Sequence, residues 1–249
     1  FTAKRTNIKD SDIEFENAWG VCDEDIYKQV IIEADKSYAN KTPFFNFIMT
    51  TSNHRPYTYP NNKIDIPSGA GRDGAVKYTD FAIGEFINQI KNKPWFNNTI
   101  IAIMADHCAS SAGKWELNVG KYHIPAIIYN LPNQKPFKIK KQASQIDFFP
   151  TLFGYLGWNY ISNFYGKDIN TINKSEQRAF IGNYRKLGLL KENKLIVLGD
   201  QKKVSFYTYK KTTNTLKPDK ENANRLEDII SYYQTNDYRY KNGLMKLKK

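Results

Sequence analysis

The sequence of 249 residues has few cysteines and no long apolar run. Its two cysteines, Cys22 and Cys108, are too few for a disulfide framework or a cysteine-rich zinc site. No segment approaches the roughly 20 apolar residues of a membrane-spanning helix, and no signal peptide is visible. The chain begins at Phe1 in a polar stretch, so we expect a piece of a longer polypeptide.

Acidic residues are outnumbered by basic ones. The sequence has 25 Asp and Glu against 37 Lys and Arg, which gives a net charge of +12. Thirty of these cations are lysines, and they are dispersed along the chain. Nucleic-acid sites more often cluster arginine with aromatic residues. The composition therefore argues against nucleic acid as a partner and favours attraction to anionic lipid or polyphosphate.

Several common nucleotide and hydrolase motifs are absent. The sequence contains no Gly-x-x-x-x-Gly-Lys-Ser/Thr loop, no Gly-x-Gly-x-x-Gly and no Gly-x-Ser-x-Gly. Residues 110–114 (SSAGK) resemble the end of a phosphate loop but lack its first glycine. Trp19 and Trp115 are predicted to be core or edge aromatics rather than parts of a ligand site.

The apolar share of 41% is enough for a substantial core. Short apolar runs at 43–51, 99–105 and 124–129 predict buried strands. Helices are predicted from Asp23, over 76–93 and over 146–156, because apolar residues recur there at helical spacing. Such alternation predicts an α/β fold with a doubly wound, mostly parallel sheet.

The pattern changes after about residue 160. Short runs separated by polar turns predict a small antiparallel sheet, followed by a surface helix over 222–233 and a Lys-rich tail. We therefore expect two domains, an α/β domain over 1–160 and an antiparallel subdomain over 161–249.

The three histidines are the main candidates for chemistry. His107 follows Asp106 directly after the strongest predicted strand, and ligands of open α/β sheets bind beyond strand ends. A carboxylate and an imidazole there suit a divalent metal, although a complete site needs further ligands. The alternative is an aspartate that caps the next turn and a histidine that fills a crevice.

His54 and His123 both lie next to predicted strands. His54 has Arg55 beside it, so its imidazole is placed to contact a phosphate or move a proton. A loop histidine bonded to the backbone is the simpler interpretation. Taken alone, His123 is better explained as a structural residue.

Taken together, the motifs resemble a known family. The similarity runs over about residues 12–170 and rests on these segments in order: 19–25 (WGVCDED), 50–57 (TTSNHRPY), 103–114 (IMADHCASSAGK), 121–125 (KYHIP) and 147–152 (DFFPTL). In this order they resemble the lipoteichoic acid synthase-like sulfatases of the alkaline phosphatase superfamily.

The resemblance implies a doubly wound α/β domain with a small C-terminal antiparallel sheet. It also implies a bacterial inner-membrane enzyme that is anchored by N-terminal helices and has its catalytic domain facing the periplasm or the outside. In this family a threonine attacks a phosphodiester with the help of one divalent metal, commonly Mn²⁺, with Mg²⁺ and Zn²⁺ as alternatives. Asp106 and His107 would be metal ligands, and His54 would be the catalytic contact to the phosphate or headgroup. Lys114 and His123 would bind substrate phosphate.

The sequence departs from the family at the nucleophile. The threonine and an acidic metal ligand normally precede the stretch that matches 19–20. A sulfatase-type Cys-x-Pro/Ala-x-Arg is also missing, because Cys22 is followed by Asp-Glu-Asp and Cys108 by Ala-Ser-Ser.

The leading hypothesis is a metal-dependent phosphoglycerol or phosphoethanolamine transferase that acts on an anionic envelope phospholipid or glycan. A sulfatase or phosphodiesterase is the alternative enzyme. A non-catalytic binding module that keeps the fold is the alternative of another class.

We predict that this chain alone turns over no phosphodiester, because the expected nucleophile lies outside its motifs. An assay with a chromogenic phosphodiester and added Mn²⁺ checks this. Product release above that of the heat-denatured chain would contradict it.

Overall fold

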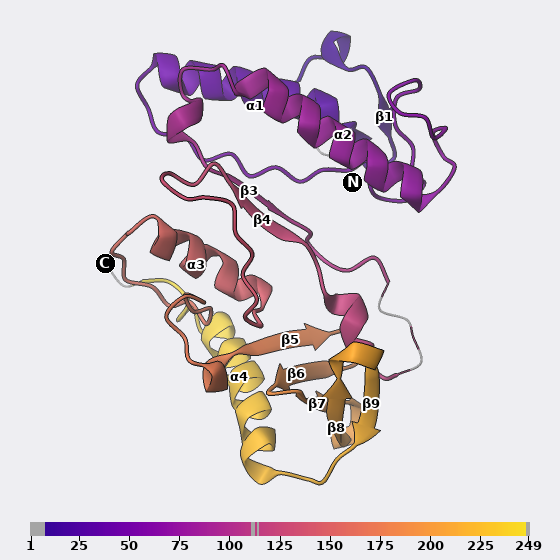
Figure 1. The fold of residues 1–249 in the computed structure, drawn as a ribbon, viewed down its shortest axis with the longest axis vertical. Coiled ribbons are helices and arrows are strands. Elements are labelled where there is room, and N and C mark those ends of the chain that lie inside the picture. The colour runs from indigo at the N-terminus through magenta and orange to yellow at the C-terminus, as the bar shows by residue number, and fades with distance from the viewer. Residues whose placement is uncertain (1–7, 111–112, 114, 248–249) are drawn as a thin grey trace. The chain divides into compact units, whose positions relative to one another are not determined.

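The computed structural model describes residues 8–110, 113 and 115–247. The chain forms two compact units, residues 1–100 and residues 101–249 (Figure 1). Within the described residues no helix combines the length and the apolarity needed to cross a bilayer.

Unit 1 is built on two long helices. Its elements are η1 (Asp10–Asp12), β1 (Glu16–Asn17), β2 (Gly20–Val21), α1 (Asp23–Ala39), α2 (Arg72–Ile90) and η2 (Phe96–Asn98). The strands β1 and β2 pair antiparallel. Helix α1 begins at the predicted acidic turn, where the carboxylates face the positive end of the helix dipole. Helix α2 begins four residues before the predicted start at 76.

Aromatic side chains hold α1 and α2 together. Tyr27 stacks on Phe86 with ring centroids 4.8 Å apart, and the Tyr78 hydroxyl donates to Glu24 Oε2 at 2.9 Å. Tyr59 stacks on Tyr78 at 4.8 Å. A Cβ at Gly74 would collide with the Tyr59 hydroxyl, so this packing needs glycine there.

The predicted strand over 43–51 is wrong. These residues are free of strand pairing in the described structure. Phe45, Phe47 and Met49 are 78%, 75% and 66% exposed. A strand needs a hydrogen-bonded neighbour, and none of the described strands pairs with this segment.

Unit 2 begins with the two other predicted strands, β3 (Ile101–Met104) and β4 (Ala126–Tyr129). They pair antiparallel, with Met104 opposite Ala126. All strand pairs in the described residues are antiparallel, so the expected parallel pairing is not seen there. Parallel neighbours need a long crossover, usually an α-helix, and the described residues between β3 and β4 contain only the single turn η3 (Val119–Tyr122).

The predicted C-terminal antiparallel sheet is confirmed. Its five strands follow one another in chain order: β5 (Arg178–Gly182), β6 (Leu187–Lys191), β7 (Lys194–Leu198), β8 (Val204–Lys210) and β9 (Thr215–Pro218). Short 3₁₀ turns flank the sheet and separate some strands, namely η5 (Lys174–Glu176), η6 (Asp200–Lys202) and η7 (Lys211–Thr213).

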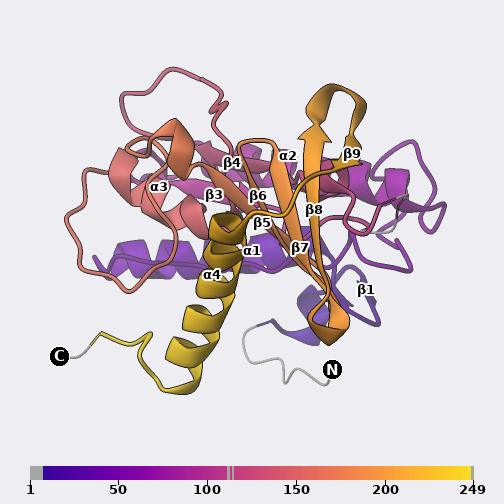
Figure 2. The ribbon, with the colours of Figure 1, turned by 90° about the horizontal axis from the view of Figure 1, so that it is seen from below.

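Both faces of this sheet are covered. Helix α4 (Ala223–Lys241) lies across one face and buries Ile229 against Leu189 and Ile196 (Figure 2). Leu117 and Val119, which precede β4, pack against the other face. Helix α4 continues eight residues beyond the predicted end at Tyr233.

A buried ion pair joins this sheet to the segment before it. The segment predicted as a helix over 146–156 forms a 3₁₀ turn, η4 (Gln145–Asp147), followed by the helix α3 (Phe148–Tyr155). The Asp147 carboxylate accepts two hydrogen bonds from Arg178, at 2.8 and 2.9 Å, and both side chains are 2% exposed. This pair crosses the predicted boundary between 1–160 and 161–249, and both of its residues lie in unit 2.

We predict that Arg178→Met lowers the free energy of unfolding by about 3–5 kcal/mol, because it leaves a buried carboxylate without its counter-charge. Urea unfolding measures the change. The matched control is Arg185→Met, which removes an ion pair to Asp200 that is exposed on both sides. Equal losses in the two variants would contradict the prediction.

Candidate functional site

Asp106 and His107 lie just beyond the end of β3, where the sequence predicts metal ligands. The backbone N–H of His107 donates to Asp106 Oδ1 at 2.8 Å, and the ring Nε2 of His107 lies 3.6 Å from Asp106 Oδ2. His107 Nδ1 lies 2.7 Å from the carbonyl oxygen of Cys108. A carbonyl can only accept, so Nδ1 carries the proton and Nε2 keeps its lone pair for a ligand.

This geometry fits two ligands of one divalent ion. Two donors at about 2.1 Å from a metal lie roughly 3.0–3.4 Å apart at octahedral or tetrahedral angles, close to the observed separation. Both side chains are more than 70% exposed, so an ion can reach them. In the part of the chain that the structure describes, no third His, Cys, Asp or Glu joins them in a cluster.

His123 lies at the same end of the strand pair. It follows η3 and precedes β4, and the Ala105 N–H donates to Pro125 O at 3.2 Å. With Met104 opposite Ala126, this bond continues the pairing toward Asp106 and His107. The antiparallel pairing thus places the backbone at His123 at the same end of the strands as that at Asp106 and His107. Lys114, the other predicted phosphate contact, lies outside the described residues.

His54 lies in unit 1, in an exposed loop. Its ring centroid is 3.6 Å from that of Trp19, with 37° between the planes. His54 Nδ1 lies 3.0 Å from Arg55 O, which leaves Nε2 for a ligand, as in His107. Trp19 is 46% exposed, which fits the prediction of an edge aromatic, and its ring lies against that of His54.

The buried Asp23 anchors the His54 loop to the start of α1. Asp23 Oδ1 accepts from the backbone N–H groups of Thr51 and Ser52, at 3.1 and 3.0 Å. The Asp23 N–H donates in return to Ser52 Oγ at 3.1 Å. The Thr51 hydroxyl donates to Val21 O at 2.8 Å. These bonds fix the backbone just before His54 to the segment that follows Trp19.

Gln145 is a positioning residue that sequence reasoning missed. Its Nε2 donates to the carbonyl oxygens of Ala105 and Asp106, at 3.1 and 2.6 Å. Gln145 belongs to η4, where Ser144 and Asp147 form a capping box. Asp147 in turn pairs with Arg178 of β5. The C-terminal sheet is thereby connected to the backbone of the predicted metal segment, a link that no sequence motif signals.

The Cys22 thiol does not supply a nucleophile in this structure. Cys22 is buried and its thiol donates to Asp25 Oδ2 at 3.2 Å. Burial raises the pKa of Cys22 to about 11, so the thiol stays protonated at neutral pH. Cys108 is partly buried beside His107 and contributes its backbone carbonyl to the histidine.

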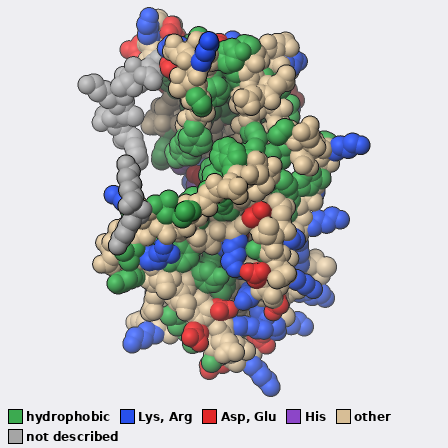
Figure 3. Space-filling view, turned by 90° about the vertical axis from the view of Figure 1, so that its left-hand side faces the viewer, with side chains coloured by type: hydrophobic (Ala, Val, Ile, Leu, Met, Phe, Trp, Pro, Cys, Tyr) green, Lys and Arg blue, Asp and Glu red, His purple; other side chains and the backbone are tan. Residues whose placement is uncertain are grey.

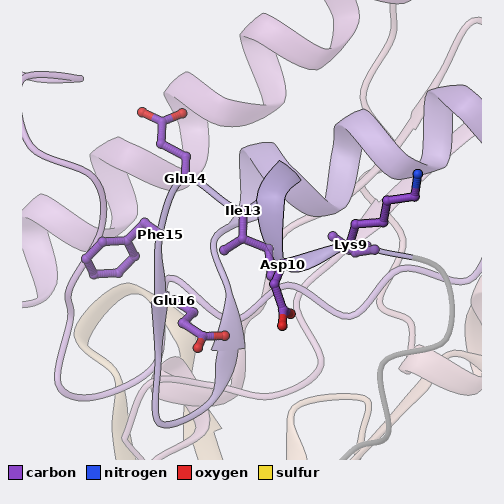
Figure 4. A pocket seen from close by; sticks show the side chains of 7 residues that line it. Lys9, Asp10, Ile13, Glu14, Phe15 and Glu16 are labelled. Carbon is purple, nitrogen blue, oxygen red and sulfur yellow. The ribbon is translucent and has the colours of Figure 1, made fainter.

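A pocket in unit 1 lies apart from the predicted site residues of that unit. It is lined by residues 8–10 and 13–16, and Figure 4 shows acidic and apolar side chains together on its wall. Glu14 forms ion pairs with Lys63 and Lys28. No histidine lines it, so we assign no chemistry to it.

Comparisons with known proteins show the family of this chain. Residues 1–158 match the family model described as Sulfatase. The chain belongs to the Sulfatase family. It is 27% identical over 157 residues to the lipoteichoic acid synthase of Staphylococcus saprophyticus, a match that covers 55% of this chain and 24% of that protein. For the lipoteichoic acid synthase of Staphylococcus aureus the identity is 29% over 137 residues, covering 47% and 21%. The matched region thus spans about a quarter of these relatives.

Solved structures extend the similarity of this Sulfatase-family chain to its C-terminal sheet. A protein of the alkaline phosphatase superfamily from Vibrio parahaemolyticus superposes with a TM-score of 0.87 and 30% identity, covering 95% of this chain and 58% of that one. The lipoteichoic acid synthase LtaP from Listeria monocytogenes shares the fold, with a TM-score of 0.70, 20% identity and coverage of 98% and 64%. The predicted family and the α/β fold class of the alkaline phosphatase superfamily are confirmed.

We predict that Gln145→Leu speeds hydrogen exchange of the backbone amides at Ala105 and His107 severalfold, because it removes the two bonds that hold the carbonyl groups of Ala105 and Asp106. Exchange monitored by NMR or mass spectrometry measures this. Gln142→Leu is the matched control, since Gln142 Nε2 donates instead to Leu190 O of β6. Unchanged exchange at Ala105 and His107 in the Gln145 variant would contradict the role.

Proposed function

We propose that this chain is part of a metal-dependent transferase of phosphoglycerol- or phosphoethanolamine-type groups in the bacterial cell envelope. The observation that carries the proposal is the Asp106–His107 pair beyond β3, in a chain of the Sulfatase family. The printed names of the relatives, lipoteichoic acid synthases, support a transfer reaction on envelope polymers. The substrate is an anionic phospholipid or glycan, which suits the net charge of +12.

Asp106 Oδ2 and His107 Nε2 are the two atoms that would hold the metal. Mn²⁺ is our first choice, and Mg²⁺ and Zn²⁺ are the alternatives. Such an ion, when bound, neutralises charge on phosphoryl oxygens and activates a hydroxyl nucleophile. The Nδ1–H···O bond to Cys108 orients the imidazole for this task without another side chain.

His54 is the proposed catalytic contact to the phosphate or headgroup. The neighbouring carbonyl engages Nδ1, so Nε2 is the ring nitrogen that can exchange a proton with a phosphate oxygen. Trp19 offers a flat, half-exposed ring beside it for a glycerol or sugar headgroup. His123, at the metal end of the strand pair, and Lys114 are proposed to bind phosphate oxygens.

We further propose that the protein works at the bacterial inner membrane with this domain facing the periplasm or the outside. Attachment would come from a segment beyond residues 1–249.

Two other functions have specific support. A sulfatase or phosphodiesterase, with water as the acceptor, is favoured by the description of the family model. A binding module that kept the fold is favoured by the lack of a third clustered ligand among the described residues.

We predict that millimolar Mn²⁺ binds this chain and that Asp106→Asn or His107→Ala weakens binding about tenfold or more, because each removes one of two ligands. The loss of the free Mn²⁺ signal in electron paramagnetic resonance measures binding directly.

His54→Ala is the control, since it deletes a histidine that lies outside the metal pair. Equal Mn²⁺ binding by the parent and both ligand variants would remove the metal-site assignment and favour the binding module.

A further inference from the structure

A run of exposed aromatic side chains follows helix α3. We call residues 158–164 the aromatic loop. Trp158, Ile161 and Phe164 are 58%, 84% and 54% exposed, and Tyr160 is 45% exposed. The sequence from 157 to 167 (GWNYISNFYGK) contains no acidic residue. Exposed apolar groups gathered in one loop mark an interaction site more often than scattered ones do.

The rings of this loop are held in place by α3. Phe153 stacks on Trp158 with centroids 5.2 Å apart and meets Tyr160 edge-on at 5.1 Å. Tyr160 in turn lies 6.2 Å from Phe164. The aromatic loop is thus a preformed apolar surface, so little ordering opposes its binding.

Cations and further apolar groups flank the aromatic loop. Asn163 Nδ2 donates to the carbonyl oxygens of Leu244 and Lys246, at 3.2 and 3.1 Å. The Arg239 guanidinium lies 5.5 Å from the ring centre of Tyr165. Leu244 and Leu247 are exposed. Figure 1 shows the chain end after α4 on the side of α3, in agreement with these bonds.

Basic residues adjoin the aromatic loop. Arg239 and Lys246 lie next to it, and the Lys241 ammonium pairs with Asp237 at 2.8 Å. Figure 3 shows exposed hydrophobic side chains on one face, with both basic and acidic side chains beside them.

We propose that the aromatic loop and the adjoining residues 239–247 bind the surface of an anionic phospholipid bilayer. Trp and Tyr rings favour the depth of the lipid headgroups, and exposed Ile, Leu and Phe side chains insert just below them. Arg239 and Lys246 pair with anionic headgroups at the same depth. This surface uses none of Asp106, His107 or His54, so it stands apart from the proposed catalytic function.

Vesicle sedimentation with the whole chain tests the proposal. We expect binding to vesicles of phosphatidylglycerol mixed with phosphatidylcholine, and much weaker binding to phosphatidylcholine alone. The double variant Ile161→Asn/Phe164→Asn should lose affinity about tenfold or more, because two inserted apolar side chains are removed. The double variant Arg239→Gln/Lys246→Gln should weaken binding to the anionic vesicles only.

The matched control is Phe45→Asn/Phe47→Asn, which removes two exposed apolar side chains from unit 1. It should leave vesicle binding unchanged, and circular dichroism verifies that each variant is folded.

Equal binding by the parent and the loop variant would overturn the proposal, since attraction would then come from diffuse surface charge. Absence of binding to anionic vesicles would overturn it as well. So would a concentration-dependent dimer in analytical ultracentrifugation that the loop variant abolishes while vesicle binding persists, because the surface would then join two copies of this chain.

Discussion

The buried pair of Asp147 and Arg178 is the interaction on which unit 2 depends. Asp147 accepts from the Ser144 and Lys167 backbone N–H groups as well as from Arg178, so one carboxylate gathers four hydrogen bonds. It thereby ties η4, the loop after α3 and the first strand of the C-terminal sheet to a single point. The cost of burying a charge is offset only because these donors surround it.

Gln145, in the same 3₁₀ turn as Asp147, connects this ion pair to the predicted metal ligands. The carbonyl groups that Gln145 holds belong to Ala105 and Asp106, where β3 ends. A small antiparallel sheet, which carries none of the candidate site residues itself, therefore helps to position the site. In unit 1 the buried Asp23 does the corresponding work for the His54 loop. In both places a carboxylate removed from solvent organises an exposed loop that carries candidate site residues.

The sequence was most informative where a local pattern determines the structure. The acidic turn at Asp23, the β-branched run at 99–105 and the short polar turns after 160 all led to the right elements, because capping, strand propensity and turn chemistry act over a few residues. The strand predicted over 43–51 was wrong, since apolar content does not indicate whether a neighbouring strand is present to pair with it. The antiparallel pairing of β3 with β4 depended on the intervening turn, which periodicity does not encode.

The site divides in the same way. Asp106, His107 and His54 could be singled out because they follow apolar runs and match an ordered set of motifs. Trp19 beside His54, and Gln145 beside Asp106, could not, because each contact joins residues that are about 35 to 40 positions apart and depends on tertiary packing.

The two candidate histidines share one device, the bond from ring Nδ1 to the carbonyl of the next residue. A hydrogen bond from one ring nitrogen to a carboxylate or a backbone carbonyl sets which nitrogen of a histidine carries the proton. In His54 and His107 the acceptor is the backbone carbonyl of the next residue, a group that every residue type has. The orientation of both imidazoles is therefore independent of which side chains stand at positions 55 and 108.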